Sequence, residues 1–172
     1  EEYDELQKGG EESDEEQGGF YLDTSSLTGK KGLNRVMNYI DSMNPPTKGK
    51  FSYKSTTKFG RIFSPEEIGK YSTKIKAISD SILDSDGIIL VYSQWLYSGL
   101  IPMALALEEL GFTRANGSPL FETPQTEPID SLTLEPKNEN QETGFVQAKY
   151  ALISGDSRIS PNNTEEIKML TN

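Results

Sequence analysis

The 172-residue sequence contains no cysteine and no histidine. These absences exclude disulfides, thiol nucleophiles, Cys/His zinc sites and a Ser-His-Asp triad within the chain. Long apolar runs are also missing: none approaches the roughly 20 residues of a membrane span, and no signal peptide is visible at the start. Hydrophobic residues make up 34% of the chain, with a mean hydropathy of −0.59. We therefore expect an intracellular protein with no membrane partner, built of one folded region and polar flanks.

The net charge of −10 is unevenly distributed along the chain. Residues 1–19 hold nine acidic residues and one lysine, and this low-complexity segment is predicted to be disordered. A nucleic-acid mimic that covers the basic segment is the alternative interpretation. Residues 30–76 hold eleven Lys/Arg against three Asp/Glu. Because the first residue is not methionine, we expect a piece of a longer protein.

Three regions follow from this composition. They are an acidic segment at 1–19, a basic lead-in at 20–63 and a folded α/β region at 64–172, which includes an insertion at 113–147. The insertion contains four prolines and a polar run, so it is expected to be functional or disordered and to lie mostly outside the central sheet.

The stretch from Ser72 to Phe112 organises the folded region and reads as helix, strand, helix. Apolar residues recur at helical spacing from Lys74 to Leu83. The run Ile88–Tyr92 is continuous, apolar and rich in β-branched residues, which predicts a strand buried on both faces of a parallel sheet. Pro102 lies in the first turn of the next helix.

The basic lead-in gives weaker signals. A short helix is predicted at Asn34–Met43, and the segment Thr28–Lys31 is interpreted as a solvated turn because it lacks the spacing of a phosphate-binding loop. Basic and aromatic residues alternate in Lys48–Gly60. This pattern fits a strand or linker with one buried aromatic face, or a clamp on a nucleic-acid backbone, in which Lys50 and Lys54 are the predicted contacts.

A second strand is predicted at Ala148–Ser154, followed by a turn at Gly155-Asp156 and a last helix that begins at Ser160-Pro161. An earlier helix start is indicated at Ser64-Pro65, with serine as the N-cap and proline in the first turn. The predicted fold class is therefore α/β, with parallel strands and flanking helices.

Three segments in this order resemble one family. They are YSTKI (residues 71–75), ILVYSQ (89–94) and YALISGD (150–156). Together they resemble a partial C-terminal RecA-like lobe of superfamily-two helicases, most of all the large-DNA-virus branch of poxvirus-type nucleoside triphosphatases and early-transcription-factor helicases. The resemblance covers roughly residues 60–112 and 148–172, with threonine at position 73 where the family has proline.

The resemblance implies a parent protein that is a nucleic-acid-dependent ATPase, a helicase or translocase, with ATP and Mg²⁺ bound mainly by an N-terminal RecA-like lobe. It also implies DNA rather than RNA as the nucleic-acid partner and a virion or viral replication site as a location. This chain lacks the phosphate loop, the metal-binding acid and the arginine finger. We therefore assign it no catalytic residue, no metal ligand and no cofactor of its own.

The candidate nucleic-acid contacts are Ser93 and Gln94 after the first predicted strand and Gly155 and Asp156 after the second. In open α/β sheets, ligands lie outside the carboxyl ends of the strands. Hydroxyl, amide and helix-start N–H groups there bind phosphate oxygens without reading bases. The resemblance independently assigns Ser93 and Gln94 to this contact. The alternative is that Ser93 caps the following helix and Gln94 faces solvent.

Two other functions stay open on the sequence. One is an α/β protein-interaction or scaffold domain with no nucleic-acid role. The other is a small hydrolase with Ser93 as nucleophile, which is disfavoured because a nucleophile elbow needs glycine two residues to either side of the serine. Val91 and Trp95 occupy those positions, and no histidine is available as a base.

Overall fold

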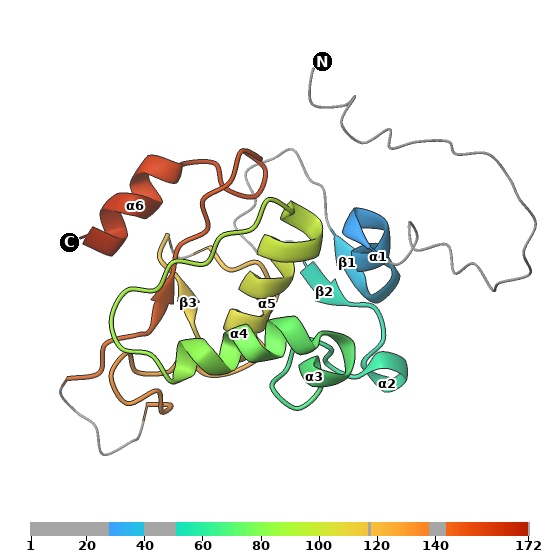
Figure 1. The fold of residues 1–172 in the computed structure, drawn as a ribbon, viewed down its shortest axis with the longest axis horizontal. Helices are drawn as coiled ribbons and strands as arrows, with labels where there is room; N and C mark the ends of the chain where they lie inside the picture. The colour runs from blue at the N-terminus through green and yellow to red at the C-terminus, as the bar shows by residue number, and fades with distance from the viewer. Residues whose placement is uncertain (1–27, 40–50, 117, 138–143, 172) are drawn as a thin grey trace, which may run out of the picture.

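The computed structural model describes residues 28–39, 51–116, 118–137 and 144–171. The acidic segment at 1–19 and Lys50 therefore lie outside the described residues. The described chain combines helices with four short strands, which come in two consecutive pairs (Figure 1). The elements are α1 (Gly29–Val36), β1 (Met37–Tyr39), β2 (Phe51–Tyr53), α2 (Thr56–Phe59), α3 (Ile68–Tyr71), α4 (Thr73–Leu83), the π-helical turn η3 (Leu96–Leu100), α5 (Ile101–Glu109), β3 (Thr113–Arg114), β4 (Lys149–Tyr150) and α6 (Asn163–Thr171). None of these helices is long and apolar enough to cross a bilayer.

Helix α5 lies in the middle of the molecule, with α4 passing across it (Figure 1). It is buried along almost its whole length, because the sequence from Ile101 to Ala106 is apolar on every side. Pro102 occupies its first turn, where the missing N–H leaves no hydrogen bond unmade. The predicted helix is thus confirmed, and Ile101 and Leu105 become fully buried members of the core.

Helix α4 also forms where the apolar spacing predicts it. The hydroxyl of Ser72 caps its start by accepting a hydrogen bond from the N–H of Ile75 at 3.2 Å. Ile82 is buried and Ile75 is partly buried against the core, so the apolar stripe faces inward. The last helix is capped in the same manner, since the Asn162 side chain accepts from the N–H of Glu165 at 3.1 Å.

The lead-in differs from its prediction. Helix α1 ends at Val36, and the residues from Met37 onward form β1, which pairs antiparallel with β2. The predicted helix at Asn34–Met43 is therefore wrong. The pairing explains why: it brings the rings of Tyr39 and Phe51 to 4.8 Å and buries Met37 and Phe51, which a helix there would not do.

The parallel sheet consists of β3 and β4, with Thr113 opposite Lys149 and Arg114 opposite Tyr150, and one isolated parallel bridge joins Phe51 to Phe121. The strand predicted at Ala148–Ser154 is therefore shorter than expected. The chain is an α/β arrangement with two small sheets, one of them parallel.

The insertion at 113–147 supplies strand β3 and, beyond it, lies mostly outside the sheets. Its described part nevertheless belongs to the folded body. Leu120, Phe121 and Ile129 are buried, and the N–H of Phe51 donates to the carbonyl of Leu120 at 2.8 Å. Of the two alternatives for the insertion, functional or disordered, the disordered one therefore fails for these residues.

The strand predicted at Ile88–Tyr92 is wrong in this structure. The segment is an irregular connection between α4 and η3, and no backbone hydrogen bond joins it to another described residue. A continuous apolar run becomes a buried strand only where neighbouring strands supply hydrogen bonds and cover its faces. No such strand lies among the described residues, so these apolar side chains stay exposed.

Two glycines provide a test of how closely the loop after α5 is packed against the insertion. Both Gly111 and Gly87 have a positive φ, at 94° and 84°. A Cβ on Gly111 would lie 2.7 Å from the Glu127 carbonyl oxygen, whereas a Cβ on Gly87 would meet nothing within 4 Å. We expect Gly87→Ala to lower the free energy of unfolding by about 1 kcal/mol through backbone strain. Gly111→Ala should lower the free energy of unfolding by about 1–3 kcal/mol more than Gly87→Ala does, because the added methyl group would clash with the Glu127 carbonyl oxygen. Urea denaturation of both variants measures the difference, and equal losses would contradict the packing around Gly111.

Candidate functional site

The segment Ser93–Trp95 leads into η3, as the predicted site requires. The Ser93 hydroxyl accepts a hydrogen bond from the Trp95 N–H at 3.1 Å and lies 3.2 Å from the Trp95 carbonyl oxygen. A Cβ on Gly99 would lie 2.1 Å from this hydroxyl oxygen, so the turn needs glycine at position 99. The Ser93 hydroxyl therefore bonds within its own turn, but it does not cap η3, whose N-cap residue is Trp95 and has no side-chain cap. Gln94 and Trp95 are exposed, with 57% of Trp95 accessible.

Helix α1 packs beside this turn. The N–H of Gly29 donates to the Ser98 hydroxyl at 2.7 Å, which ties the first residue of α1 to η3. The ammonium of Lys30 lies 5.5 Å and 5.6 Å from the ring centroids of Tyr39 and Tyr97. Thr28–Lys31 is thus the start of a helix and not the solvated turn that the sequence predicted. No local signal shows this contact, because Gly29 and Ser98 are 69 residues apart.

Five basic residues of the lead-in are exposed, on α1, on α2 and directly after β2. They are Lys30, Lys31, Arg35, Lys54 and Lys58. The ammonium of Lys54 donates to the backbone carbonyl of Asn34, so this predicted contact also holds β2 to α1. The neighbouring aromatic side chains point the other way, since Phe51 is buried and Tyr53 is partly buried against the core. These two rings are therefore unavailable to stack on bases.

The turn at Gly155-Asp156 is held by its own hydrogen bonds. The Asp156 carboxylate accepts from the Arg158 guanidinium at 3.0 and 2.6 Å and from the Arg158 N–H at 2.9 Å. Its backbone N–H donates to the Ser154 hydroxyl at 3.2 Å. A Cβ on Gly155 would meet nothing within 4 Å. The connection between β4 and α6 loops over toward the same end of the molecule as the start of α5 (Figure 1), but no hydrogen bond among the described residues joins Gly155 or Asp156 to Ser93 or Gln94.

A buried carboxylate holds the lead-in against α5. Glu109 has a fully buried side chain, which accepts from the Tyr53 hydroxyl at 2.5 Å and from the Arg61 guanidinium. Burial and the bond to Glu109 raise the pKa of Tyr53 well above its usual range. The same carboxylate raises the pKa of Arg61 through their hydrogen bond. Both groups therefore keep their protons and anchor β2 and its following loop to α5.

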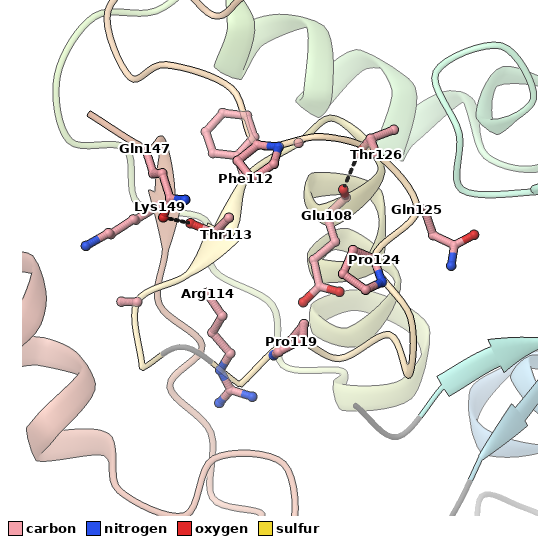
Figure 2. Close-up of a pocket in the computed structure, with 13 residues that line it drawn as sticks. Glu108, Phe112, Thr113, Arg114, Pro119, Pro124, Gln125, Thr126, Gln147 and Lys149 are labelled. Atoms are coloured by element: carbon pink, nitrogen blue, oxygen red, sulfur yellow. Dashed lines mark hydrogen bonds between the residues drawn. The ribbon is translucent and has the colours of Figure 1, made fainter. Parts of the chain in front are cut away.

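A second buried carboxylate lies at a cavity of about 390 Å³ between the end of α5, the parallel strands and the loop at 119–128 (Figure 2). The Glu108 carboxylate accepts from the N–H groups of Leu120 and Phe121, at 2.6 and 2.9 Å, and from the Tyr150 hydroxyl at 2.5 Å. Burial raises the pKa of Glu108 despite these bonds. Much of the wall is apolar and comes from Phe112 and three prolines. None of the predicted site residues lines this cavity.

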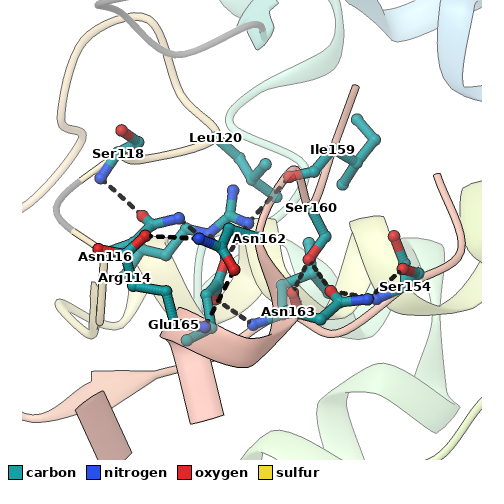
Figure 3. A network of polar contacts seen from close by, with 12 residues as sticks. Arg114, Asn116, Ser118, Leu120, Ser154, Ile159, Ser160, Asn162, Asn163 and Glu165 are labelled. Carbon is teal, nitrogen blue, oxygen red and sulfur yellow. Dashed lines mark hydrogen bonds and ion pairs between the residues drawn. The ribbon is translucent and has the colours of Figure 1, made fainter. Parts of the chain in front are cut away.

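Arg114, which also lines the cavity, already has hydrogen-bond partners of its own. Arg114 is buried and pairs with Glu166, with its Nε 3.1 Å from Glu166 Oε1, and it donates to the Ile159 carbonyl at 2.9 Å. Asn116 donates to the same carboxylate at 2.8 Å (Figure 3). Since Leu152 N–H supplies a fourth donor at 2.8 Å, this network docks α6 on β3 and β4. The Glu166 carboxylate accepts all four of these hydrogen bonds within the protein, so the network has a structural role.

Within the part of the chain that the structure describes, no cluster of three or more acidic side chains is placed to hold a metal ion. Comparison with models of known protein families, with curated proteins and with solved structures finds no match to this chain.

The buried Glu108 makes stability depend on pH. Its folded-state pKa lies above the ordinary value of 4.5, so the folded state holds this proton more tightly than the unfolded state. The corresponding stabilisation is present below pH 4.5 and is lost as the pH rises through the raised pKa. We expect the unfolding free energy of the wild type, measured relative to Glu108→Gln, to fall as the pH rises above 4.5. Urea denaturation of both proteins across this range checks the sign. A difference that rises with pH would contradict the burial of this carboxylate.

Proposed function

We propose that this chain is part of the C-terminal RecA-like lobe of a nucleic-acid-dependent NTPase and that it contacts a nucleic-acid backbone. The contact face consists of α1, η3 and the turn Ser93–Trp95, and we name it the α1–η3 face. The observation that carries the proposal is the hydrogen bond from Gly29 to Ser98. It joins the basic helix α1 to η3, which directly follows the turn with Ser93 and Gln94, the two residues that the family resemblance marks for backbone contact.

The charge of the α1–η3 face supports this proposal. Lys30 and Lys31 occupy the first turn of α1, where no acidic residue is present. The backbone N–H groups at a helix start add positive potential to that of the side chains. Phosphate neutralisation by lysine supplies most of the affinity in binding that ignores sequence.

The exposed ring of Trp95 completes the face. An aromatic side chain stacks on any base, because every base has a π-face, so it adds affinity without sequence preference. Gln94 is exposed beside Trp95 and offers an amide to a phosphate oxygen. Ser93 has the smaller role of fixing the turn, since its hydroxyl is bonded to Trp95.

One observation favours the alternative function of a protein-interaction domain. The apolar segment Ile88–Tyr92 is exposed directly before the proposed contact face. The two functions are separable by experiment, because the lysines and the apolar segment are different residues.

Anisotropy with a labelled single-stranded DNA of about 20 nucleotides tests the proposal. We expect binding that weakens steeply with salt. Lys30→Gln/Lys31→Gln should flatten the plot of log affinity against log salt by about 0.7 per lysine. Trp95→Ala should weaken binding by about 1–3 kcal/mol without changing the slope, because it removes stacking and no charge.

A double variant with the same charge change serves as the control. Lys137→Gln/Lys149→Gln removes two exposed lysines that lie outside the α1–η3 face. It should leave the salt slope closer to that of the wild type than Lys30→Gln/Lys31→Gln does. Equal slopes for the two double variants would show that binding follows overall charge and would remove the support for the α1–η3 face.

A second prediction concerns catalysis. Phosphoryl transfer depends on positioned phosphates, a metal ion and charge neutralisation, and the chain lacks the motifs that provide them in this family. We expect the purified chain to hydrolyse no ATP, with or without DNA. Turnover that persists through purification to homogeneity would contradict the assignment to a partial lobe.

A further inference from the structure

The cavity at the end of α5 is large enough to hold a small ligand. Its volume of about 390 Å³ lies within the range of ligand pockets, roughly 300–1,000 Å³. The apolar part of its wall includes the rings of Phe112 and three prolines. Gln147 and Lys149 also line the cavity and are exposed, so a ligand has a path from solvent.

Glu108 brings an unused hydrogen-bond acceptor to this cavity. The residue is only 8% exposed. Its Oε1 accepts from the N–H of Leu120 and from the Tyr150 hydroxyl, and its Oε2 accepts from the N–H of Phe121. A carboxylate has about four acceptor positions. One position on Oε2 therefore has no donor among the described residues.

Arg114 brings unused donors to the same cavity. It is only 6% exposed, and its Nε and Nη2 donate to Glu166 and to the Ile159 carbonyl. A guanidinium has five N–H donors, and the two on Nη1 have no acceptor among the described residues. Burial raises the pKa of Glu108, and the positive charge of Arg114 partly opposes this shift, so the two groups are close. Both side chains extend toward Pro119 (Figure 2).

The opposite charges of Glu108 and Arg114 select a neutral ligand. An anion would meet the carboxylate and a cation would meet the guanidinium, in a site with little water to screen the repulsion. Lys149 adds positive charge only on the solvent side, where salt screens it. The open hydrogen-bond positions are an acceptor on Glu108 and donors on Arg114. They match a ligand edge that carries one donor and one acceptor.

We propose that this cavity binds a small neutral heterocycle with a lactam edge, in which a ring N–H lies next to a C=O group. The N–H donates to Glu108 Oε2, the C=O accepts from Arg114 Nη1, and the ring packs against Phe112 and the prolines. Glu108 lies about 10 Å along the helix axis from Ile101, where α5 follows η3. The site is therefore separate from the α1–η3 face and does not depend on nucleic-acid binding.

A matched pair of ligands tests the proposal on the unaltered chain. 2-Quinolone has the lactam edge, and N-methyl-2-quinolone has the same rings but no N–H. In an NMR titration of the ¹⁵N-labelled full chain, 2-quinolone should bind with a Kd of about 0.1–1 mM, as a ligand of this size allows. The N-methyl compound should bind at least about tenfold more weakly, because it leaves the buried acceptor of Glu108 unpaired.

The same spectra locate the site. The amide signals of Phe112, Thr113 and Thr126 should shift with 2-quinolone. The indole signal of Trp95, the only tryptophan in the chain, should not, because it belongs to the α1–η3 face. No shifts at millimolar 2-quinolone, as for a cavity that holds only water, would overturn the proposal. Equal affinities of the two ligands, or shifts centred on Trp95, would overturn it as well.

A cavity-filling variant provides an independent test. Ala115→Leu adds a larger side chain to the cavity wall and leaves both hydrogen-bonding groups in place, so it should weaken 2-quinolone binding at least about tenfold. Ala151→Leu makes the same change at another half-buried alanine, one that does not line the cavity, and should leave the Kd unchanged. A folded Ala115→Leu variant that binds like the wild type contradicts the site. The ligand pair decides the question on the wild type if this variant does not fold.

Discussion

Two adjacent carboxylates on α5 determine how this chain is assembled. Glu108 and Glu109 are both buried, and a buried carboxylate is tolerated only when donors surround it. Neighbouring residues on a helix point about 100° apart, so the two side chains recruit their donors from different parts of the chain. Glu108 is satisfied by the insertion and by Tyr150 of β4. Glu109 is satisfied by Tyr53 and Arg61 of the lead-in. Loss of either carboxylate would leave donors from distant segments unpaired.

This arrangement also explains where the basic charge lies. The bonds of Tyr53 and Arg61 to Glu109 hold β2 and its following loop against α5. β2 pairs with β1, and β1 follows directly from α1, so the same anchor fixes the position of α1 beside η3. The carboxylates of Glu108 and Glu109 are thus buried and hydrogen-bonded, whereas Lys30 and Lys31 of α1 are exposed to solvent. A segment with excess positive charge reaches the start of α5 because of a carboxylate near the end of α5.

The sequence predicts the parts of this structure that depend on local signals. Helix α4 has regular apolar spacing, α5 begins with an apolar run after a clear start, and both are found where expected. Strand β1 is missed because its partner strand β2 begins only at Phe51. The pairing of the two strands outweighs the weak helical pattern that the sequence shows at Asn34–Met43. The strand prediction at Ile88–Tyr92 fails for the converse reason: the segment has the apolar pattern of a strand, but no partner strand for it lies among the described residues. In the candidate site, Ser93 and Gln94 are expected at the end of a strand but lie in an irregular turn before η3. Lys30 is missed because only a contact across 69 residues brings α1 to η3.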